Sequence, residues 1–296
     1  MTSPHRFGTV ALVGRPNVGK STLLNALVGA KLTIVTPKPQ TTRNRIAGIR
    51  TLPGAQAVFL DTPGIHTPRS PLTRHMVRLA REAWAEADVV LVVVDAVAGI
   101  RSGDARILTE GAAQASTVLV ALNKIDRVAK PKLLPLLQTL GELVPDRPLV
   151  PVSAIDGTQI DRLLELIVSD LPVGEARYPE DIYTTATVRF MAQEIVREQV
   201  FLATHEEIPY GTAVVIEDFV EDAKRGLTEI HATILVERVN HRGIIIGAGG
   251  KQLGGIGRRA RGALEELLGT RVYLQLFVRA EPDWSRKRDR LAELGL

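Results

Sequence analysis

The sequence predicts two domains of different class, an α/β domain with a mostly parallel sheet and helices on both faces, and then a smaller α+β domain. The length of 296 residues is sufficient for two domains that each bury a core. Short β-branched runs alternate with longer amphipathic stretches up to about residue 170, which is typical of α/β proteins. Beyond that point the order of the expected elements changes.

The first domain is expected to alternate strands and helices. Its strands are expected at residues 10–13, 57–60, 89–94, 118–122 and 149–152. Its helices are expected at residues 20–28, 71–87, 104–114, 131–143 and 158–171. The run at 89–94 contains only valine and leucine, which is typical of a strand buried on both faces.

A change of composition separates the domains. Residues 171–181 carry two prolines, one glycine and four charges, which predicts a linker. We expect domains at 1–172 and 183–296, joined by a linker at 173–182. The second domain is expected to contain strands at 183–188, 213–221, 229–237 and 271–279, a strand-like run at 244–246, helices at 192–204 and 251–268, and a short basic C-terminal helix at 284–294.

Composition excludes several classes of function. With 45% apolar and 24% charged residues the chain is a soluble globular protein, and the absence of cysteine excludes disulfides, thiolate zinc sites and cysteine nucleophiles. The apolar runs are far shorter than the ~20 residues that span a bilayer. The first ten residues contain no apolar segment of secretory length. A cytoplasmic protein is therefore expected.

The net charge of +4 is unevenly distributed. Residues 1–172 hold 20 basic and 14 acidic side chains, whereas residues 173–296 hold 17 basic and 19 acidic ones, a difference of −2. A basic protein often binds nucleic acid. Here the basic excess lies in the first half, so the sum alone does not locate such a site.

A phosphate-binding pattern follows the first expected strand. Residues 14–21 match G-x-x-x-x-G-K-[ST] between a strand and a helix, where glycine N–H groups and the helix N-terminus can surround phosphates. Lys20 would reach the β- and γ-phosphates, and the Ser21 hydroxyl would ligate Mg²⁺. The expected nucleotide contacts here are Gly14, Arg15, Pro16, Asn17, Val18, Gly19, Lys20, Ser21 and Thr22.

A second pattern, Asp61-Thr62-Pro63-Gly64, ends the next expected strand. The Asp61 carboxylate can hold Mg²⁺ through water, and the Gly64 N–H can meet the γ-phosphate. Alone, this could be an ordinary strand-terminating turn. After a phosphate-binding loop, the nucleotide role is favoured.

A third group of residues predicts the base. Asn123, Lys124 and Asp126 follow the strand at 118–122, and Ser153 and Ala154 follow the strand at 149–152. The Asp126 carboxylate can accept hydrogen bonds from guanine N1–H and its 2-amino group, and a backbone N–H after the second strand can meet the guanine oxygen. Adenine offers neither donor, which disfavours the alternative of an ATP-using enzyme.

These motifs, in this order, resemble those of translation-factor-type GTPases of the Era/EngA/MnmE branch, and GRPNVGKSTLLNALVG is particularly similar to that branch. The resemblance implies a P-loop GTPase domain in which residues 36–45 form the first switch. It implies that Thr42 ligates Mg²⁺ and the γ-phosphate, with Thr41 as the alternative. Lys20, Thr42 and Gly64 are the expected catalytic residues.

Two positions bear on the mechanism. Ras-like relatives carry a water-orienting glutamine where Ile65 follows Gly64 here, and an alkyl side chain cannot orient water, so we expect slow intrinsic hydrolysis. In similar GTPases the asparagine of the phosphate loop holds a K⁺ ion that bridges the phosphates. Asn17 matches that position, with simple support of the loop as the alternative.

A glycine-rich loop marks the second domain. Residues 247–250 form a G-x-x-G loop before a helix, and from 238 to 261 there are six basic residues and no acidic one. In KH domains such a loop clamps the backbone of about four unpaired nucleotides. The expected RNA-binding residues are Arg242, Gly247, Ala248, Gly249, Gly250, Lys251, Arg258 and Arg259.

The run IIIGAGGKQLGGIGRRAR resembles the type II KH domain that ends Era proteins. The resemblance implies a ribosome assembly factor that binds GTP and GDP, contacts the single-stranded 3′ end of 16S rRNA, and acts on the small (30S) subunit, with switch loops that gate RNA binding. Peripheral membrane contact is implied by resemblance only, and no DNA partner is expected. The alternative is a nucleotide-gated RNA-binding module with incidental hydrolysis. Ala248 and Gly254 replace residues that are often basic, which predicts weaker or less salt-dependent RNA binding.

Overall fold

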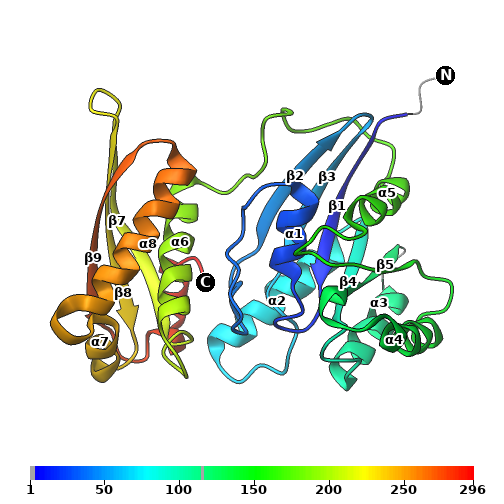
Figure 1. Ribbon diagram of the computed structural model, residues 1–296, viewed down its shortest axis with the longest axis horizontal. Helices are drawn as coiled ribbons and strands as arrows, with labels where there is room; N and C mark the ends of the chain where they lie inside the picture. Colours follow the sequence, from blue (N-terminus) through cyan, green and yellow to red (C-terminus); the bar gives the residue numbers. More distant parts are fainter. Residues whose placement is uncertain (1–3, 115–116) are drawn as a thin grey trace. The chain divides into compact units, whose positions relative to one another are not determined.

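A computed structural model describes residues 4–114 and 117–296. It divides into two compact units, one comprising the chain up to residue 69 with 73–185, and one comprising 70–72 with 186–296. Figure 1 shows that each unit has its own sheet flanked by helices. The α/β and α+β classes predicted from the sequence are confirmed.

The first unit is built on a six-stranded sheet of order β2-β3-β1-β4-β5-β6. Five strands are parallel, and β2 pairs antiparallel with β3. The strands are β1 (Arg6–Val13), β2 (Ile46–Leu52), β3 (Ala55–Asp61), β4 (Val89–Asp95), β5 (Val118–Asn123) and β6 (Leu149–Pro151). Since the parallel strands end at the same edge, the loops that follow them meet there.

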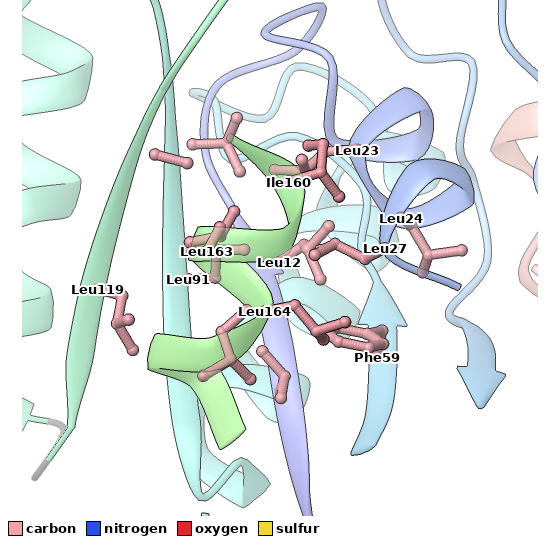
Figure 2. Packing of buried hydrophobic residues seen from close by; sticks show 14 of the residues in the cluster. Leu12, Leu23, Leu24, Leu27, Phe59, Leu91, Leu119, Ile160, Leu163 and Leu164 are labelled. Atoms are coloured by element: carbon pink, nitrogen blue, oxygen red, sulfur yellow. The ribbon is translucent and has the colours of Figure 1, made fainter. Parts of the chain in front are cut away.

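Helices cover both faces of this sheet. They are α1 (Lys20–Val28), α2 (Pro71–Glu86), α3 (Ser102–Gln114), α4 (Lys130–Leu143) and α5 (Ile160–Asp170), with a 3₁₀ turn η1 (Ile125–Arg127). Side chains of α1 and α5 pack on one face, where Figure 2 shows Leu23 of α1 and Leu163 of α5 near Leu12 of β1. Side chains of α2, α3 and α4 pack on the other, around Trp84 and Leu108. All seven residues of β4 are buried, as its valine-rich run predicts.

Strand β2 is absent from the sequence-based expectation. Its segment, Ile-Ala-Gly-Ile-Arg-Thr-Leu, contains a glycine and an arginine and lacks a β-branched run. Pairing with β3 stabilises the strand, and Gly48 lets it pack closely on α1, since an added Cβ would come within 2.8 Å of Val28 and 3.1 Å of Leu24. Tertiary contact therefore outweighs the weak local preference.

The segment predicted as a linker is bound along the sheet of the first unit. Gly174 N–H donates to the His5 carbonyl at 3.0 Å, and the buried Gln56 side chain bonds Arg177 and Tyr178. The predicted strand at 183–188 is wrong. Only Thr184 forms an isolated bridge, with Gly48 of β2, and a helix begins at Val188.

The second unit has a three-stranded sheet of order β7-β8-β9, in which β7 and β8 are antiparallel and β8 and β9 parallel. Helices α6 and α8 cover one face (Figure 1), with the core between them and the sheet. The elements are α6 (Val188–Ala203), β7 (Thr212–Asp222), β8 (Leu227–Val236), α7 (Val239–Ile246), η2 (Ala248–Gly250), α8 (Lys251–Leu268), β9 (Arg271–Ala280), η3 (Trp284–Arg286) and α9 (Arg288–Glu293).

Two expectations for this unit are corrected. Helix α6 begins earlier than predicted because the Thr187 hydroxyl caps it, accepting from Phe190 N–H at 3.2 Å. The isoleucine run 244–246 ends helix α7 and is not a strand. Ile245 is fully buried, whereas Ile244 is 47% exposed. The β-branched residues favour a strand locally, but the helix directs Ile245 into the core.

The C-terminal basic segment is anchored. Trp284 is buried and its indole N–H donates to the Gly211 carbonyl at 3.0 Å, while Arg290 donates to Glu281 at 2.8 Å and Leu291 is buried.

Among the described residues no helix combines the length and apolarity needed to cross a membrane.

We predict that Gln56→Ala frees the segment around residue 177. Gln56 Oε1 accepts from Arg177 N–H at 2.9 Å and Tyr178 N–H at 3.0 Å, and Nε2 donates to the Tyr178 carbonyl at 2.8 Å. Loss of these bonds should speed amide hydrogen exchange across 174–180 by about tenfold or more. Gln138→Ala, at an exposed position of α4, is the control. Equal exchange in both variants would contradict this anchoring role.

Candidate functional site

A cavity of about 310 Å³ lies at the carboxyl edge of the six-stranded sheet. The phosphate-loop pattern, the first-switch segment, and the residues after β5 and β6 line it. Of the predicted nucleotide-binding residues, those that line the cavity are Pro16, Asn17, Gly19, Lys20, Ser21, Thr22, Thr42, Gly64, Asn123, Lys124, Asp126 and Ala154. The others do not line it: Gly14, Arg15, Val18, Asp61, Thr62, Pro63 and Ser153.

The phosphate loop is closely surrounded, which requires its glycines. A Cβ on Gly14 would lie 2.5 Å from the Val93 carbonyl oxygen, and one on Gly19 would lie 2.3 Å from the Asn123 side-chain nitrogen. Both glycines also have positive φ, 155° and 98°. The loop therefore presents its backbone to the cavity in a conformation that larger residues would disrupt.

Lys20 lies buried beneath this loop. Its ammonium group donates to the carbonyl oxygens of Gly14 at 3.2 Å and Arg15 at 3.1 Å. Burial lowers the pKa of Lys20 to about 8, opposed in part by the negative charge of Asp61. An anion in the cavity would favour the charged form of this lysine.

Three oxygen-bearing side chains meet beside Lys20. The Ser21 hydroxyl donates to Asp61 Oδ2 at 2.7 Å, the Thr42 hydroxyl donates to the same oxygen at 3.0 Å, and the two hydroxyls lie 2.8 Å apart. Asp61 Oδ1 is buried without a hydrogen-bond partner. Burial raises the pKa of Asp61, opposed by Lys20 and by these hydrogen bonds. Oxygen donors of this kind fit Mg²⁺.

The two candidate switch threonines have different partners. Thr41 Oγ1 lies 2.6 Å from Thr36 Oγ1 and donates to the Lys38 carbonyl at 2.8 Å. Both partners belong to the switch segment, so Thr41 stabilises the conformation of that segment. Thr42 meets Ser21 and Asp61 instead. The geometry therefore brings Thr42, the first choice from the sequence, to the predicted metal site.

The Asp-Thr-Pro-Gly segment lies against the phosphate loop. A Cβ on Gly64 would come within 2.4 Å of the Pro16 nitrogen, and Ile65 N–H donates to the Gly14 carbonyl at 3.0 Å. The Thr62 hydroxyl donates to the Leu12 carbonyl at 2.7 Å, so its role in the structure is to hold β3 beside β1. The Ile65 side chain is buried in the core and offers no polar group to the cavity.

Asn123 joins three loops. Its side-chain amide donates to the Val18 carbonyl at 3.0 Å, and its oxygen accepts from Ala154 N–H at 3.1 Å. The sequence assigned a serine-alanine N–H to a guanine oxygen, but the Ala154 N–H has this internal partner. Asn123 thereby fixes the phosphate loop to the loop after β6.

The neighbouring residues shape the opening of the cavity. Lys124 donates to the Asn17 carbonyl at 2.6 Å and forms an ion pair with Asp95 at 2.7 Å. The buried Ser153 donates its hydroxyl to Asp126 at 2.8 Å, which orients that exposed carboxylate. A carboxylate held at the rim is placed to accept hydrogen bonds from a base.

Sequence reasoning missed two aspartates. Asp95 orders its loop by accepting from Val97 N–H at 2.8 Å as well as pairing with Lys124. Asp104 accepts from Arg15 Nε at 2.8 Å and holds the arginine of the phosphate loop beside α3. For Asp95 a signal existed, since it ends a buried strand at the edge where ligands bind. No motif marks Asp104.

The candidate RNA loop joins α7 to α8 in the second unit. Gly247, Gly249 and Gly250 have positive φ values of 70°, 56° and 75°, and no atoms crowd the Cβ positions of Gly249 and Gly250. Ala248 and Gly249 are exposed, as are Arg242, Lys251 and Arg258. Arg259 donates to Gln199 at 3.1 Å and is thus held against α6. The loop leaves room for the sugar-phosphate backbone of an RNA to approach.

A phosphate loop beside a switch threonine, with an Asn-Lys-x-Asp segment and a separate G-x-x-G unit, defines a guanine-nucleotide-binding P-loop protein with a KH domain. The family described as "50S ribosome-binding GTPase" matches residues 9–124, and the KH domain family matches 207–285. GTPase Era of Geotalea uraniireducens is 47% identical over 98% of this chain and 97% of its own, and that of Geobacter metallireducens is 46% identical over 99% and 98%. The chain belongs to the Era GTPase family.

Two solved structures cover nearly the whole chain. One is Era in complex with MgGDPNP and nucleotides 1506–1542 of 16S ribosomal RNA, and the other is an Aquifex aeolicus Era variant bound to GDP·AlF₄⁻. Each is 41% identical with a TM-score of 0.94, and the match covers 98% of this chain and 99% of the other. The likeness extends over both units.

We predict that Thr42→Ala and Thr41→Ala separate the two switch threonines. Thr42→Ala removes a hydroxyl that meets Ser21 and Asp61, whereas Thr41→Ala removes one directed at Thr36. Thr42→Ala should lower GTP turnover about a hundredfold or more, and Thr41→Ala less than about fivefold. Single-turnover GTP hydrolysis at saturating Mg²⁺ measures both. The reverse order would transfer the assignment to Thr41.

Proposed function

We propose that this protein is a Mg²⁺-dependent GTPase that binds the single-stranded 3′ end of 16S rRNA through its KH domain during assembly of the small ribosomal subunit. The observation that carries the proposal is the convergence of the Ser21 and Thr42 hydroxyls on one carboxylate oxygen, Oδ2 of Asp61. Family membership and the related complexes with MgGDPNP and 16S rRNA support it. A cytoplasmic site of action follows from the ribosomal partner.

The residues divide the work at the phosphates. The backbone of the phosphate loop and Lys20 would hold the β- and γ-phosphates, and Ser21, Thr42 and Asp61 would hold Mg²⁺. When bound, Mg²⁺ supplies positive charge that stabilises the transferred phosphoryl group. Thr42 and Gly64 belong to segments that order around the γ-phosphate and are released after hydrolysis.

No glutamine follows Gly64 to orient the attacking water, because that position is Ile65, whose side chain is buried in the core. Intrinsic hydrolysis is therefore slow. Asn17, exposed at the cavity with a positive φ of 66°, is the group available to hold a K⁺ ion against the phosphates. Charge supplied there would assist the transition state.

The KH domain would hold RNA at the exposed Gly247–Gly250 turn, assisted by Lys251 and Arg258. Nucleotide-dependent order in the switch segments would control when RNA is held. An RNA-binding module with incidental hydrolysis is the competing function. The two differ in whether RNA alters the hydrolysis of GTP or the affinity for it.

Asp126→Asn should change the base preference from guanine to xanthine. An amide would present a donor to the N1–H and 2-amino group of guanine, whereas xanthine has an oxygen at that position. We expect GTP affinity to fall by about a hundredfold and XTP affinity to rise correspondingly. Competition binding with fluorescent nucleotides measures both. Asp156→Asn, a nearby exposed aspartate paired with Thr158, is the control and should retain the preference for GTP.

RNA should stimulate turnover if the nucleotide and RNA sites are coupled. Single- and multiple-turnover GTP hydrolysis is measured with and without an RNA of the 16S 3′-terminal sequence, for the wild type and for Lys251→Ala. We expect stimulation in the wild type and a weaker, less salt-dependent effect in the variant. If RNA leaves both the hydrolysis rate and the nucleotide affinity unchanged, the function reduces to the competing one.

Potassium should accelerate hydrolysis through Asn17. We expect turnover several-fold faster in KCl than in NaCl at matched ionic strength, and the difference should disappear in Asn17→Ala. Comparison of initial rates in the two salts tests this. Equal wild-type rates would leave Asn17 a role in loop geometry only.

A further inference from the structure

Strand β9 presents a face that the G-x-x-G loop does not use. Because successive side chains of a strand point to opposite faces, its residues form two sets. Val272, Leu274, Leu276 and Val278 pack in the core of the second unit. The other set faces away from that core and comprises Arg271, Tyr273, Gln275, Phe277 and Arg279.

Polar and aromatic side chains alternate along this outward set. Tyr273 and Phe277 are 51% and 50% exposed, and Arg271 and Arg279 at the two ends are exposed as well. Exposed aromatic side chains gathered on one face mark an interaction surface. Only 4% of this chain is aromatic, so two exposed rings on one strand face are a concentrated feature.

The surroundings hold these side chains in place. The His231 ring, on neighbouring β8, lies edge-on to Tyr273 with centroids 6.4 Å apart, and it pairs with Asp218 of β7 at 3.2 Å. Arg271 donates to the Arg225 carbonyl at 3.0 Å. Arg279 lies 3.6 Å from Glu281, a carboxylate that Arg290 also holds at 2.8 Å, so the exposed Arg279 guanidinium remains available to a phosphate.

We propose that the outward face of β9 is a second RNA surface, on which bases of a single strand stack on Tyr273 and Phe277 while phosphates meet Arg271 and Arg279. Aromatic rings on a sheet face, flanked by arginines, are a recurring way to hold unpaired nucleotides. Acidic residues also lie on this face: Asp218 of β7 pairs with His231, and Glu229 of β8 lies opposite Tyr273 in the register, so they repel phosphates and confine the path to the outer side of β9.

The spacing also suits a single strand. Four residues along a strand separate Tyr273 and Phe277 by about 13 Å. This exceeds the ~3.4 Å between stacked bases, so the rings would hold separated nucleotides. The Gln275 amide lies between them and offers donors and acceptors to an intervening base.

The surface extends the RNA site of the proposed function and rests on it. β9 lies at the end of its sheet, and both α7 and α8 contact it from the core side. An RNA leaving the loop between those helices can cross this edge to the outward face. The bound length would then exceed the about four nucleotides that a G-x-x-G loop holds.

RNA length separates the two surfaces experimentally. Affinities of the full chain are measured by fluorescence anisotropy for a short and a long unstructured RNA, about 6 and 16 nucleotides of the 16S 3′-terminal sequence. Tyr273→Ala/Phe277→Ala should weaken the long RNA about tenfold or more and leave the short one unchanged. Lys251→Ala, at the G-x-x-G loop, should weaken both. Tyr183→Ala, an exposed tyrosine of the first unit, is the matched control.

A variant that keeps an aromatic ring at both positions distinguishes a loss of stacking from a folding defect. Tyr273→Trp/Phe277→Tyr should bind the long RNA like the wild type. Wild-type affinity of the double alanine variant for the long RNA would overturn the inference, and the proposed function would stand if Lys251→Ala still weakens binding. A change in self-association alone, seen by sedimentation, would make the face a protein interface and also overturn it. Unaltered RNA binding in all variants would instead count against the proposed function.

Discussion

A single carboxylate oxygen, Oδ2 of Asp61, receives the hydroxyl groups of Ser21 and Thr42, and the arrangement of the nucleotide site depends on it. The three side chains come from the end of β3, the start of α1 and the switch segment. The parallel pairing of β1 with β3 brings the first two together, since Leu12 lies opposite Asp61 in the register. The switch segment has no such support from the sheet and is held through Thr42. A site built this way can be fixed on two sides and adjustable on the third.

Much of the first domain could be predicted because its signals are local. Valine-rich runs such as β4 define buried strands, and glycines are required at 14 and 19 because an added Cβ would come within 2.5 Å of neighbouring atoms. What could not be predicted depends on pairing and packing that the local pattern of side chains does not show. β2 forms through pairing with β3, and the isoleucine run ending at Ile246 belongs to a helix because Ile245 enters the core.

The candidate site shows the same division. Motifs identified Asn123 and Ser153, yet their partners are other loops: Asn123 bonds Val18 and Ala154, and Ser153 orients Asp126. Asp104, the partner of Arg15, has no motif at all. The charge sum was equally uninformative for the RNA domain, which is acidic overall. What matters in this domain is where its basic residues lie, which is beside the Gly247–Gly250 turn and along β9.

The attachment of Tyr183 and Thr184 to β2 has a further consequence. β2 is the outermost strand of its sheet, and such a strand offers unpaired N–H and C=O groups to other chains. The Tyr183 carbonyl accepts from Ile49 N–H at 2.8 Å, and the Thr184 hydroxyl donates to the Ala47 carbonyl at 2.6 Å. These contacts occupy backbone groups at the edge of the sheet that could otherwise pair with another chain. A nucleotide domain cut at residue 172 would therefore expose the edge of β2 and become prone to aggregation. One that ends after residue 185 would keep the contacts that cover this edge.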